Sequence, residues 1–384
     1  MNYKLQKPHP HQQRVIDWNP KKAILAHEMR TGKSLIACNW VDHPCRAGNT
    51  YIITIKQNFK EWVLMQTNAT VITKETFKKL APTINNPTAI VVDEASFFAS
   101  GLFVKGRSQL SEALYKLVKT YPDMDVLLLT ATPVRQSAWS LHTLLCYIGV
   151  YYDWKKWRSE FFELVKLPFL RFPAWMPKNN WRIKIRPFLE KHCDIVSLKD
   201  IVEYLPEPQT IIIKVEHKEK YKKPLDEITT WIDEHKWEQQ DKVQEILALG
   251  YQKLIVVVKY TYQIDEIAKE LAKEKEVFIL DGRTKKPDDV KKQAQESEEC
   301  YLIVQSSMGM GWDGWMFGAM VFVSMAHTVV DYIQMTGRPR HLGHLHPVFF
   351  YYLIGGRWDK RIYETIKSGK DFSPHEFTRA DEAE

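Results

Sequence analysis

Short apolar runs alternate with helical stretches through the first part of the chain. Runs that are apolar at nearly every position are typical of strands covered on both faces. Helical spacing is found between them, as at 34–41 and 109–118. This alternation predicts a parallel, doubly wound α/β sheet whose ligands bind beyond the carboxyl ends of the strands. The apolar runs lie at 23–26, 51–55, 89–92 and 126–130.

The same pattern begins again after Pro208 and predicts a second α/β lobe. Between the two patterns, residues 151–206 are rich in Trp, Phe, Lys and Pro and have no regular period, which predicts a helical, tryptophan-rich insertion and linker. The predicted divisions are a first lobe at 1–150, the insertion at 151–206, a second lobe at 207–370 and a polar tail at 371–384. The apolar runs of the second lobe lie at 210–215, 253–258, 277–280, 301–304, 320–323 and 348–353.

Composition agrees with two folded lobes. The chain has 384 residues, of which 45% are hydrophobic and 26% charged, enough to build two cores and a wet surface. A net charge of +7 mildly favours a polyanionic partner. The five cysteines lack the close pairing of a zinc ribbon, and no run is long enough to span a membrane. We therefore expect a soluble, cytoplasmic protein with reduced thiols and no membrane association.

A phosphate-binding loop is predicted between the first strand and the first helix of the α/β pattern. Backbone N–H groups at a helix N-terminus are suited to hold phosphate oxygens. The lysine of such a loop adds a positive charge at the β- and γ-phosphates, and the following hydroxyl is a Mg²⁺ ligand. The predicted ATP-binding residues here are Met29, Arg30, Thr31, Gly32, Lys33 and Ser34.

Two adjacent carboxylates follow the apolar strand predicted at 89–92. ATP hydrolysis needs one carboxylate that holds Mg²⁺ and another that orients the attacking water, and Asp93 and Glu94 are the candidates for these roles. The simpler interpretation, an acidic turn that caps a helix, is less favoured beside a phosphate loop. Thr130 and Thr132 end another apolar strand and are predicted to couple this site to the second lobe.

The order of these motifs resembles helicase superfamily 2, and within it the Swi/Snf-like ATPases, including compact bacteriophage members. The resemblance covers nearly the whole chain outside 151–206. It implies that Gln12 reads adenine, while Arg30 stands where the family often has glycine. The segments 54–62 and 72–77 resemble those that touch nucleic acid. The residues that the resemblance places there are Lys56, Asn58, Lys60, Lys74 and Thr76.

In the second lobe, residues 305–313 resemble the motif that touches nucleic acid and the ATP ribose. The resemblance assigns Gln305 and Ser306 to nucleic acid, and Gly311 and Asp313 to ATP. Residues 334–344 resemble the motif that carries the arginine fingers. They supply a coupling glutamine and a first finger, while the second finger is either of two neighbours, with the arginine favoured. These residues are Gln334, Arg338, and Arg340 or His341.

The resemblance implies two RecA-like lobes that hold ATP and Mg²⁺ between them in a nucleic-acid-stimulated ATPase. The expected function is ATP-driven translocation on duplex or branched DNA, with remodelling of branched DNA or displacement of bound proteins as outcomes. RNA is a less favoured partner. Two alternatives stay open, a strand-separating helicase on DNA or RNA and a regulatory ATP-binding switch. We expect a monomer, in the host cytoplasm if the chain is encoded by a phage.

Tryptophans alternate with basic residues in the predicted insertion. Aromatic and cationic side chains in such a mixture stack on bases or wedge a duplex in some proteins, and pack an insertion onto its neighbours in others. Packing is the favoured interpretation for any single tryptophan. Lone basic residues near the contact segments, among them Arg107 and Arg135, are weaker candidates for phosphate contacts. The tryptophans of the insertion are Trp154, Trp157, Trp175 and Trp181.

Overall fold

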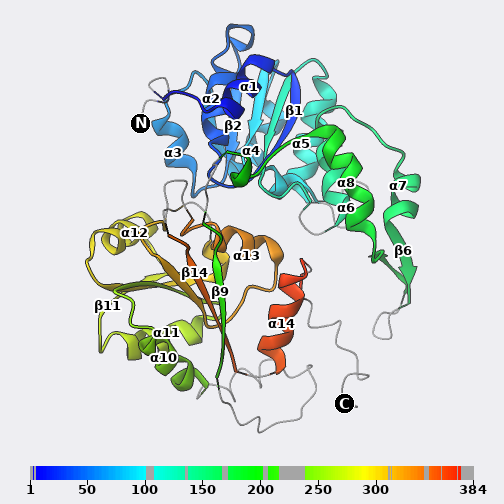
Figure 1. The fold of residues 1–384 in the computed structure, drawn as a ribbon. Helices are drawn as coiled ribbons and strands as arrows, with labels where there is room; N and C mark the ends of the chain where they lie inside the picture. The colour runs from blue at the N-terminus through cyan, green and yellow to red at the C-terminus, as the bar shows by residue number, and fades with distance from the viewer. Residues whose placement is uncertain are drawn as a thin grey trace. The chain divides into compact units, whose positions relative to one another are not determined.

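The computed structural model divides into two compact units, Met1–Glu203 and Tyr204–Glu384, each of which we describe by itself (Figure 1). Among the described residues, no helix is both long and apolar enough to cross a membrane. All five cysteines are free thiols, and four of them are buried. The structure describes residues 3, 6–100, 108–134, 137–166, 172–201, 206–215, 238–309, 312, 314–340, 346–355, 357–369 and 371–372.

The first unit is built on a six-stranded sheet in the order β3-β2-β4-β5-β1-β8, with every neighbouring pair parallel. Consecutive residues of one strand alternate between two cores because successive side chains point to opposite faces. Ile24 and Ala26 face one core, and Ala23 and Leu25 face the other. The strands are β1 (Lys22–His27), β2 (Thr50–Thr54), β3 (Thr70–Thr73), β4 (Ala89–Val92), β5 (Asp125–Leu129) and β8 (Cys193–Val196).

Helices cover both faces of this sheet, as expected for a doubly wound fold. One core receives residues of α1 (Pro10–Trp18), α2 (Lys33–Val41) and α3 (Phe59–Leu64). The other core receives residues of the remaining helices. They are α4 (Lys74–Leu80), α5 (Gln109–Thr120), α6 (Ala138–Tyr147), α7 (Trp154–Phe161) and α8 (Trp181–His192).

The second unit repeats this architecture with a parallel sheet in the order β11-β12-β10-β13-β14-β9. Two doubly wound α/β units are therefore present, as the apolar pattern predicts. The strands are β9 (Gln209–Lys214), β10 (Lys253–Val258), β11 (Glu276–Leu280), β12 (Cys300–Gln305), β13 (Ala319–Phe322) and β14 (Phe349–Ile354). The helices are α10 (Glu238–Ala248), α11 (Thr261–Leu271), α12 (Pro287–Glu296), α13 (Val329–Thr336) and α14 (Arg357–Lys367).

The predicted insertion is helical only in part. It contains α7 and α8, and also an antiparallel hairpin of β6 (Phe162–Val165) and β7 (Ala174–Pro177). Its last strand, β8, pairs in parallel with β1 and extends the first sheet. The first unit thus continues to Glu203 rather than ending where the insertion begins, at 151. Most of the predicted tail, from 373 onward, lies outside the described residues.

Three of the insertion's tryptophans are packed into the first unit. Trp157 is only 2% exposed, and its indole N–H donates to the carbonyl of Ala138 at 3.1 Å. Trp181 is also buried, and Trp154 stacks on Trp139 with ring centroids 4.1 Å apart. The packing interpretation therefore describes these three residues, whereas Trp175 is exposed.

We expect Trp157→Ala to lower the free energy of unfolding by about 3–5 kcal/mol, because it removes a buried aromatic and leaves a cavity. For a unit of this size that corresponds to a fall of roughly 10 °C in the melting temperature. Calorimetry of this variant beside Trp175→Ala, which removes an exposed indole, provides the matched comparison. Equal melting temperatures for the two variants would contradict the packing role of Trp157.

Candidate nucleotide site

Three of the predicted motifs lie at one edge of the first sheet. Strands β4, β5 and β1 are neighbours and parallel, so their carboxyl ends meet at the same edge. The loop 28–32 follows β1, Thr130 follows β5, and Asp93 follows β4. Ligands of doubly wound sheets bind at this kind of edge. The sheet order therefore places the phosphate loop, the threonines and the carboxylates close to one another.

The loop between β1 and α2 turns through left-handed backbone. Gly32, the residue that precedes α2, has φ +77°, and a Cβ at this position would lie 2.1 Å from Nε2 of Gln12. Glycine is thus required both for the turn and for the close approach of Gln12. Arg30 also has a positive φ, +65°, which is unusual for a residue with a side chain. Glycine is the residue that adopts this left-handed backbone most readily.

Lys33 begins α2 and its ammonium is directed back over the loop. Its Nζ donates to the carbonyl oxygens of His27 at 2.7 Å and Glu28 at 2.9 Å. A helix N-terminus carries partial positive charge, and Gly32 has no side chain that would cap it. Ser34 follows in the first turn and is partly exposed. The loop thus presents a lysine, a hydroxyl and backbone N–H groups in the first turn of one helix.

Gln12 ties the first helix to the phosphate loop. Its amide Nε2 donates to the carbonyl of Thr31 at 3.0 Å, and its Oε1 accepts from the backbone N–H of His9 at 2.8 Å. His11 Nε2 lies 2.8 Å from the same Thr31 carbonyl, so this nitrogen carries the proton. Burial lowers the pKa of His11 below its usual value. Hydrogen bonds from α1 to the Thr31 carbonyl therefore join this helix to the loop. Adenine reading by Gln12 stays a prediction.

The strand β8 supports the same loop, which the sequence did not indicate. The backbone N–H of Glu28 donates to the carbonyl of Val196 at 2.8 Å, and the Glu28 carboxylate accepts from the N–H of Leu198 at 2.8 Å. Asp194 lies 2.7 Å from both His27 Nε2 and an Arg14 nitrogen. Burial raises the pKa of Asp194, but the hydrogen bonds from His27 and Arg14 outweigh it and leave that pKa below its usual value.

Asp93 is held by three donors on one of its oxygens. Its Oδ2 accepts from the Thr54 hydroxyl at 2.8 Å, the Asn58 amide at 3.1 Å and the Trp62 indole at 2.9 Å. Its Oδ1 accepts from the N–H of Glu94 at 3.0 Å. The residue is only 7% exposed. Because Oδ2 is fully used, Oδ1 is the oxygen that remains suited to a further ligand.

This arrangement gives unexpected positions to two residues of the 54–62 segment. Asn58 is predicted to touch nucleic acid, and in the structure its amide donates to Asp93. Trp62 lies at the end of the same segment and is buried on Asp93. The feature of the sequence that could have indicated this contact is a tryptophan, which has an N–H donor, in a helix whose other residues are mostly polar or exposed. Nucleic-acid contact by Asn58 stays a prediction, and any movement of the segment would act directly on the carboxylate.

Glu94 and the two threonines complete the edge. Glu94 has φ +50°, in the left-handed region that carries strain for a residue with a side chain. The backbone N–H of Thr132 donates to the Thr130 hydroxyl at 3.0 Å. Both threonines are buried, and the Thr132 hydroxyl has no hydrogen-bond partner among the described residues. A buried hydroxyl of this kind is suited to a ligand or to a moving partner group.

The other predicted nucleic-acid residues of the first unit follow the carboxyl ends of β2 and β3. Lys56, Lys60 and Thr76 are exposed. Lys74 is partly buried, and its ammonium lies 4.3 Å from the centre of the Phe97 ring. The weaker candidates at 107 and 135 lie outside the described residues. The exposed lysines thus follow the carboxyl ends of the strands, at the same edge of the sheet as the predicted phosphate loop.

In the second unit, Arg338 is fixed by residues of its own unit. Its Nη1 donates to the carbonyl of Trp312 at 2.8 Å, and its Nη2 donates to the Gln334 side-chain oxygen at 3.0 Å. Gln334 is buried. A Cβ on Gly309 would lie 3.1 Å from the backbone nitrogen of Met335, so the 305–309 segment packs closely on α13. The segment that follows β12 therefore packs directly against α13, so the two predicted motifs are in contact.

Two more predicted residues of the second unit, Gln305 and Ser306, lie at the end of β12 and directly after it. Gln305 accepts from the N–H of Gly282 at 3.1 Å and donates to the carbonyl of Lys259 at 3.3 Å, and Ser306 is buried. Arg340 is partly exposed. Gly311, Asp313 and His341 lie outside the described residues. Gln305 thus joins the carboxyl ends of three strands, β10, β11 and β12.

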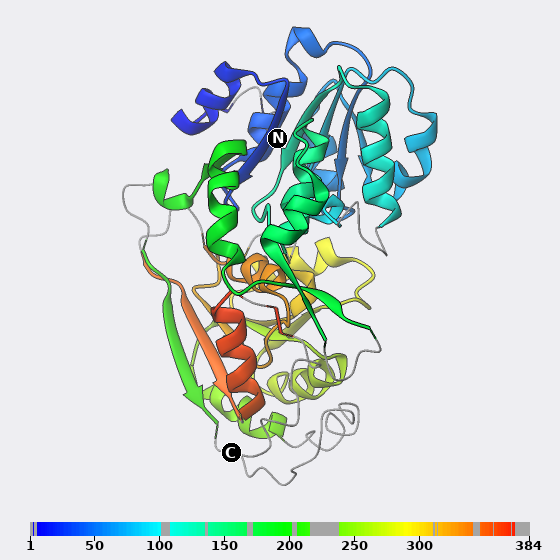
Figure 2. The same cartoon turned by 90° about the vertical axis from the view of Figure 1, so that its right-hand side faces the viewer.

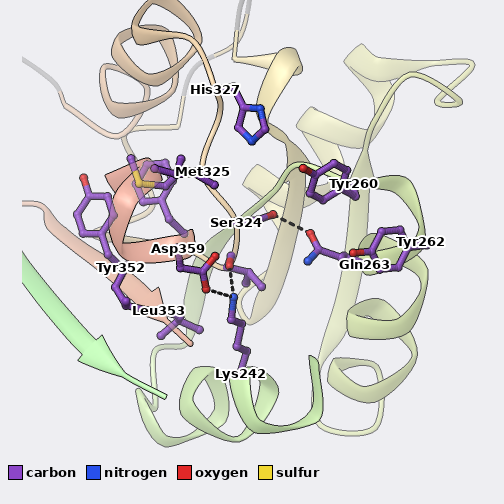
Figure 3. Close-up of a pocket in the computed structure, with 14 residues that line it drawn as sticks. Lys242, Tyr260, Tyr262, Gln263, Ser324, Met325, His327, Tyr352, Leu353 and Asp359 are labelled. Atoms are coloured by element: carbon purple, nitrogen blue, oxygen red, sulfur yellow. Dashed lines mark hydrogen bonds and ion pairs between the residues drawn. The ribbon is translucent and has the colours of Figure 1, made fainter. Parts of the chain in front are cut away.

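A pocket lies beyond the carboxyl ends of β10, β13 and β14 (Figure 3). Its floor is a buried ion pair in which Lys242 contacts Asp359 at 2.7 Å and also donates to the carbonyl of Val323. The Ser324 hydroxyl donates to Gln263 at 2.7 Å. His327 lies at the other end of the pocket in Figure 3. Burial, aided by the charge of Lys259, lowers the pKa of His327 to about 3.

The partly buried His327 predicts a loss of stability in mild acid. Since its pKa is lower in the folded than in the unfolded state, the neutral form stabilises the fold above pH 6.5, and this contribution decreases as pH falls from 6.5 toward 3. Between pH 7 and pH 5 the loss is about 2 kcal/mol. Urea unfolding of the wild type and His327→Gln at both pH values measures it. The same pH dependence in both proteins would contradict this role of His327.

Comparisons with known proteins bear on the fold. The sequence matches no family model and no curated protein. The Sulfolobus solfataricus SWI2/SNF2 ATPase core in complex with dsDNA is similar at 15% identity and a TM-score of 0.43, over 94% of this chain and 91% of that one. The Mycobacterium smegmatis helicase Lhr bound to ssDNA and AMP-PNP is similar at 11% identity and a TM-score of 0.57, over 96% of this chain and 49% of that one. This chain therefore shares the two-lobed fold found within about half the length of that helicase.

Proposed function

We propose that the chain is an ATP-dependent translocase that moves on DNA. The observation that carries the proposal is the edge formed by β4, β5 and β1, where a phosphate loop, two buried threonines and an acidic pair follow neighbouring parallel strands. Separately, each of these features is common. Their convergence on one edge is what an ATP-hydrolysing site requires.

The phosphate loop supplies the binding of ATP. Lys33 offers a full charge to the β- and γ-phosphates once its ammonium leaves the carbonyls of His27 and Glu28. The first turn of α2 adds N–H groups, and the left-handed turn at Gly32 lets the backbone approach the phosphates. Met29, Arg30 and Thr31 form the rest of the loop. We assign Gln12 to the adenine because it lies directly against Gly32.

The residues at the edge fit a magnesium ion. Mg²⁺ prefers oxygen ligands. The Ser34 hydroxyl, in the first turn of α2, and Asp93 Oδ1, directly after β4, are the two proposed protein ligands. When bound, the ion neutralises charge on the phosphate oxygens. The three donors on Oδ2 hold the Asp93 carboxylate in one orientation and leave Oδ1 for a ligand.

Hydrolysis needs a base and a positive charge beyond the phosphate loop. We assign Glu94 to orient the attacking water and accept its proton, since it follows Asp93 and is only partly buried. Arg338 is assigned to stabilise the charge on the leaving phosphate, with Gln334 holding its guanidinium. Arg340 is the proposed second arginine. ATP turnover would then depend on both units, which is how a motor couples hydrolysis to movement.

The segments after β2 and β3 are proposed to bind the phosphate backbone. Lys56 and Lys60 are exposed there, and phosphate contacts supply most of the affinity of a sequence-independent binder. Asn58 lies between them and contacts Asp93, which gives a direct route from the nucleic acid to the ATP site. The M. smegmatis helicase whose fold is shared was solved with ssDNA and AMP-PNP, which supports a nucleic-acid substrate here.

Two alternatives predict different results in the same assays. A strand-separating helicase would unwind a forked duplex, whereas a translocase on duplex DNA would displace a triplex-forming strand without unwinding. A regulatory switch would bind ATP and hydrolyse it at the same slow rate with or without nucleic acid. Triplex displacement and fork unwinding, measured in parallel with ATP and with AMP-PNP, separate the three. We expect ATP-dependent triplex displacement, and unwinding without triplex displacement would overturn the proposal of duplex translocation.

A further inference from the structure

The basic charge of the chain is concentrated in one short segment of the first unit. Residues 151–192 contain ten lysines and arginines and four acidic residues, an excess of six out of the seven net charges of the whole chain. This segment comprises α7, the β6–β7 hairpin and α8. Figures 1 and 2 show the hairpin extending from the helical part of this segment, away from the six-stranded sheet. An anionic partner is the kind that such a segment fits.

One face of the hairpin is an exposed apolar surface. Leu164 and Trp175 are directly opposite each other in the β6–β7 register, so their side chains lie on the same face. They are 56% and 40% exposed, respectively. Glu163, the acidic residue of β6, lies on the opposite face because side chains alternate along a strand. The face of β6 that carries Leu164 therefore has no carboxylate, and the exposed pair on it is apolar.

A cation lies on the exposed indole. The Arg158 guanidinium is 4.4 Å from the centre of the Trp175 ring. Lys178, just after β7, donates to the carbonyl of Ser159 at 2.6 Å, and its backbone N–H donates to Phe161 at 3.0 Å. These bonds join the end of the hairpin to α7. An aromatic ring with an arginine beside it, held on a fixed support, is typical of surfaces on which bases stack.

The hairpin is rigidly attached at its base. Phe162 of β6 stacks on Trp139 of α6 with ring centroids 3.7 Å apart, and Trp139 stacks on Trp154 in turn. The same face of the hairpin thus runs from a buried aromatic stack to the exposed pair of Leu164 and Trp175. Burying aromatic rings at the root of a hairpin limits its movement. A wedge between bases needs this combination of a fixed root and an exposed aromatic end.

We propose that the face formed by Leu164, Trp175 and Arg158, here called the hairpin face, binds unpaired bases of nucleic acid. This inference rests on the proposed function, because it adds a second contact for the same nucleic acid, beyond the lysines that follow β2. Trp175 would stack on a base, and Arg158 would contact the base plane or a neighbouring phosphate. Duplex without open ends offers no unpaired base and should gain little from this face.

Binding of fluorescein-labelled oligonucleotides to the full chain, without nucleotide, tests the inference. Trp175→Ala should raise the Kd for a single-stranded oligonucleotide by about 5- to 100-fold, the loss expected for one stacked base. Trp175→Phe should retain most of the affinity, and a closed circular duplex should bind both variants equally. Leu164→Ser should weaken single-strand binding in the same direction. Melting temperatures should stay at the wild-type value.

The matched control is Leu80→Ser, since Leu80 is also an exposed leucine of the first unit, at 41%. Unchanged single-strand affinity in Trp175→Ala and Leu164→Ser would overturn the inference, as would an equal loss in Leu80→Ser. Binding of an apolar partner protein or of anionic vesicles that these substitutions abolish, with unchanged oligonucleotide affinity, would also overturn it. Single-strand binding that depends on Trp175 in a chain that does not hydrolyse ATP would overturn the proposed function and leave the hairpin face supported.

Discussion

Lys33→Ala should reduce steady-state ATP hydrolysis by about 10²-fold or more while DNA binding remains close to the wild-type level. Removing a single preorganised donor from a site where charge develops costs a factor of this size in related reactions. The DNA affinity should persist because the residues proposed to bind DNA lie outside the phosphate loop. They are Lys56, Lys60 and the residues of the hairpin face. A coupled ATPase assay and oligonucleotide anisotropy on the same preparation measure both quantities.

Lys116→Ala is the control for this experiment. Lys116 is 73% exposed on α5, and its ammonium lies 3.1 Å from the Glu112 carboxylate one turn away. Its loss should change neither turnover nor affinity. If Lys33→Ala hydrolysed ATP at the wild-type rate, the assignment of loop 28–34 to phosphate binding would be wrong. If it lost DNA binding together with hydrolysis, the two sites would not be separable as proposed.

Arg338→Ala should lower DNA-stimulated turnover by about 10³- to 10⁵-fold, the effect of an arginine finger in phosphoryl transfer. ATP should still bind, because the phosphate loop is in the other unit. Arg338→Lys keeps the charge but loses the planar fork that contacts Gln334 and the Trp312 carbonyl, so we expect it to recover only part of the rate. Single-turnover hydrolysis and binding of a fluorescent ATP analogue separate the two steps.

Stability has to be measured in the same variants, because Arg338 also makes hydrogen bonds within its unit. A fall in melting temperature that accounts for the lost rate would point to a structural role. Lys360→Ala is the comparison, since this exposed lysine of α14 forms only a long ion pair, 3.9 Å, with Glu364. Turnover close to the wild-type rate in folded Arg338→Ala would remove the arginine from the proposed mechanism.

The sheets were predictable because their strands are buried on both faces. Central strands such as β4, β5 and β10 are apolar at nearly every position, which is typical of strands covered on both faces. The positions of the predicted phosphate loop and acidic pair directly after two such strands were predictable for a related reason, while their roles toward ATP stay predictions. Each motif is defined by particular residue types directly after an apolar strand. The prediction of the strand and the prediction of the motif therefore strengthen each other.

Edge elements were harder to predict. Strand β8 is short and contains Asp194, whose carboxylate is hydrogen-bonded to Arg14 and His27 from distant parts of the chain. A charged residue in a short edge strand gives no periodic signal, so the sequence could not assign it to the first sheet. The hairpin of β6 and β7 was hidden for a similar reason, because each strand has only four residues and β7 ends in Pro177.

The contacts of Asp93 were also beyond sequence reasoning. The segment 54–62 was interpreted as a nucleic-acid contact, and its direct link to the carboxylate depends on the pairing of β2 with β4. That pairing places Thr54, Asn58 and Trp62 over Asp93, although they are separated from it by more than thirty positions in the chain. Tertiary contacts of this kind are set by sheet order, which a single sequence does not state.

The most direct test of the account is the rate of ATP hydrolysis by the wild-type chain with increasing duplex DNA. A motor of the proposed kind should turn over slowly alone and faster, up to a saturating rate, as DNA is added. Single-stranded DNA, forks, four-way junctions and RNA measured in parallel define the preferred substrate. The account predicts DNA-dependent stimulation that disappears in Lys33→Ala and in Arg338→Ala. A rate that is the same with and without every nucleic acid would contradict it.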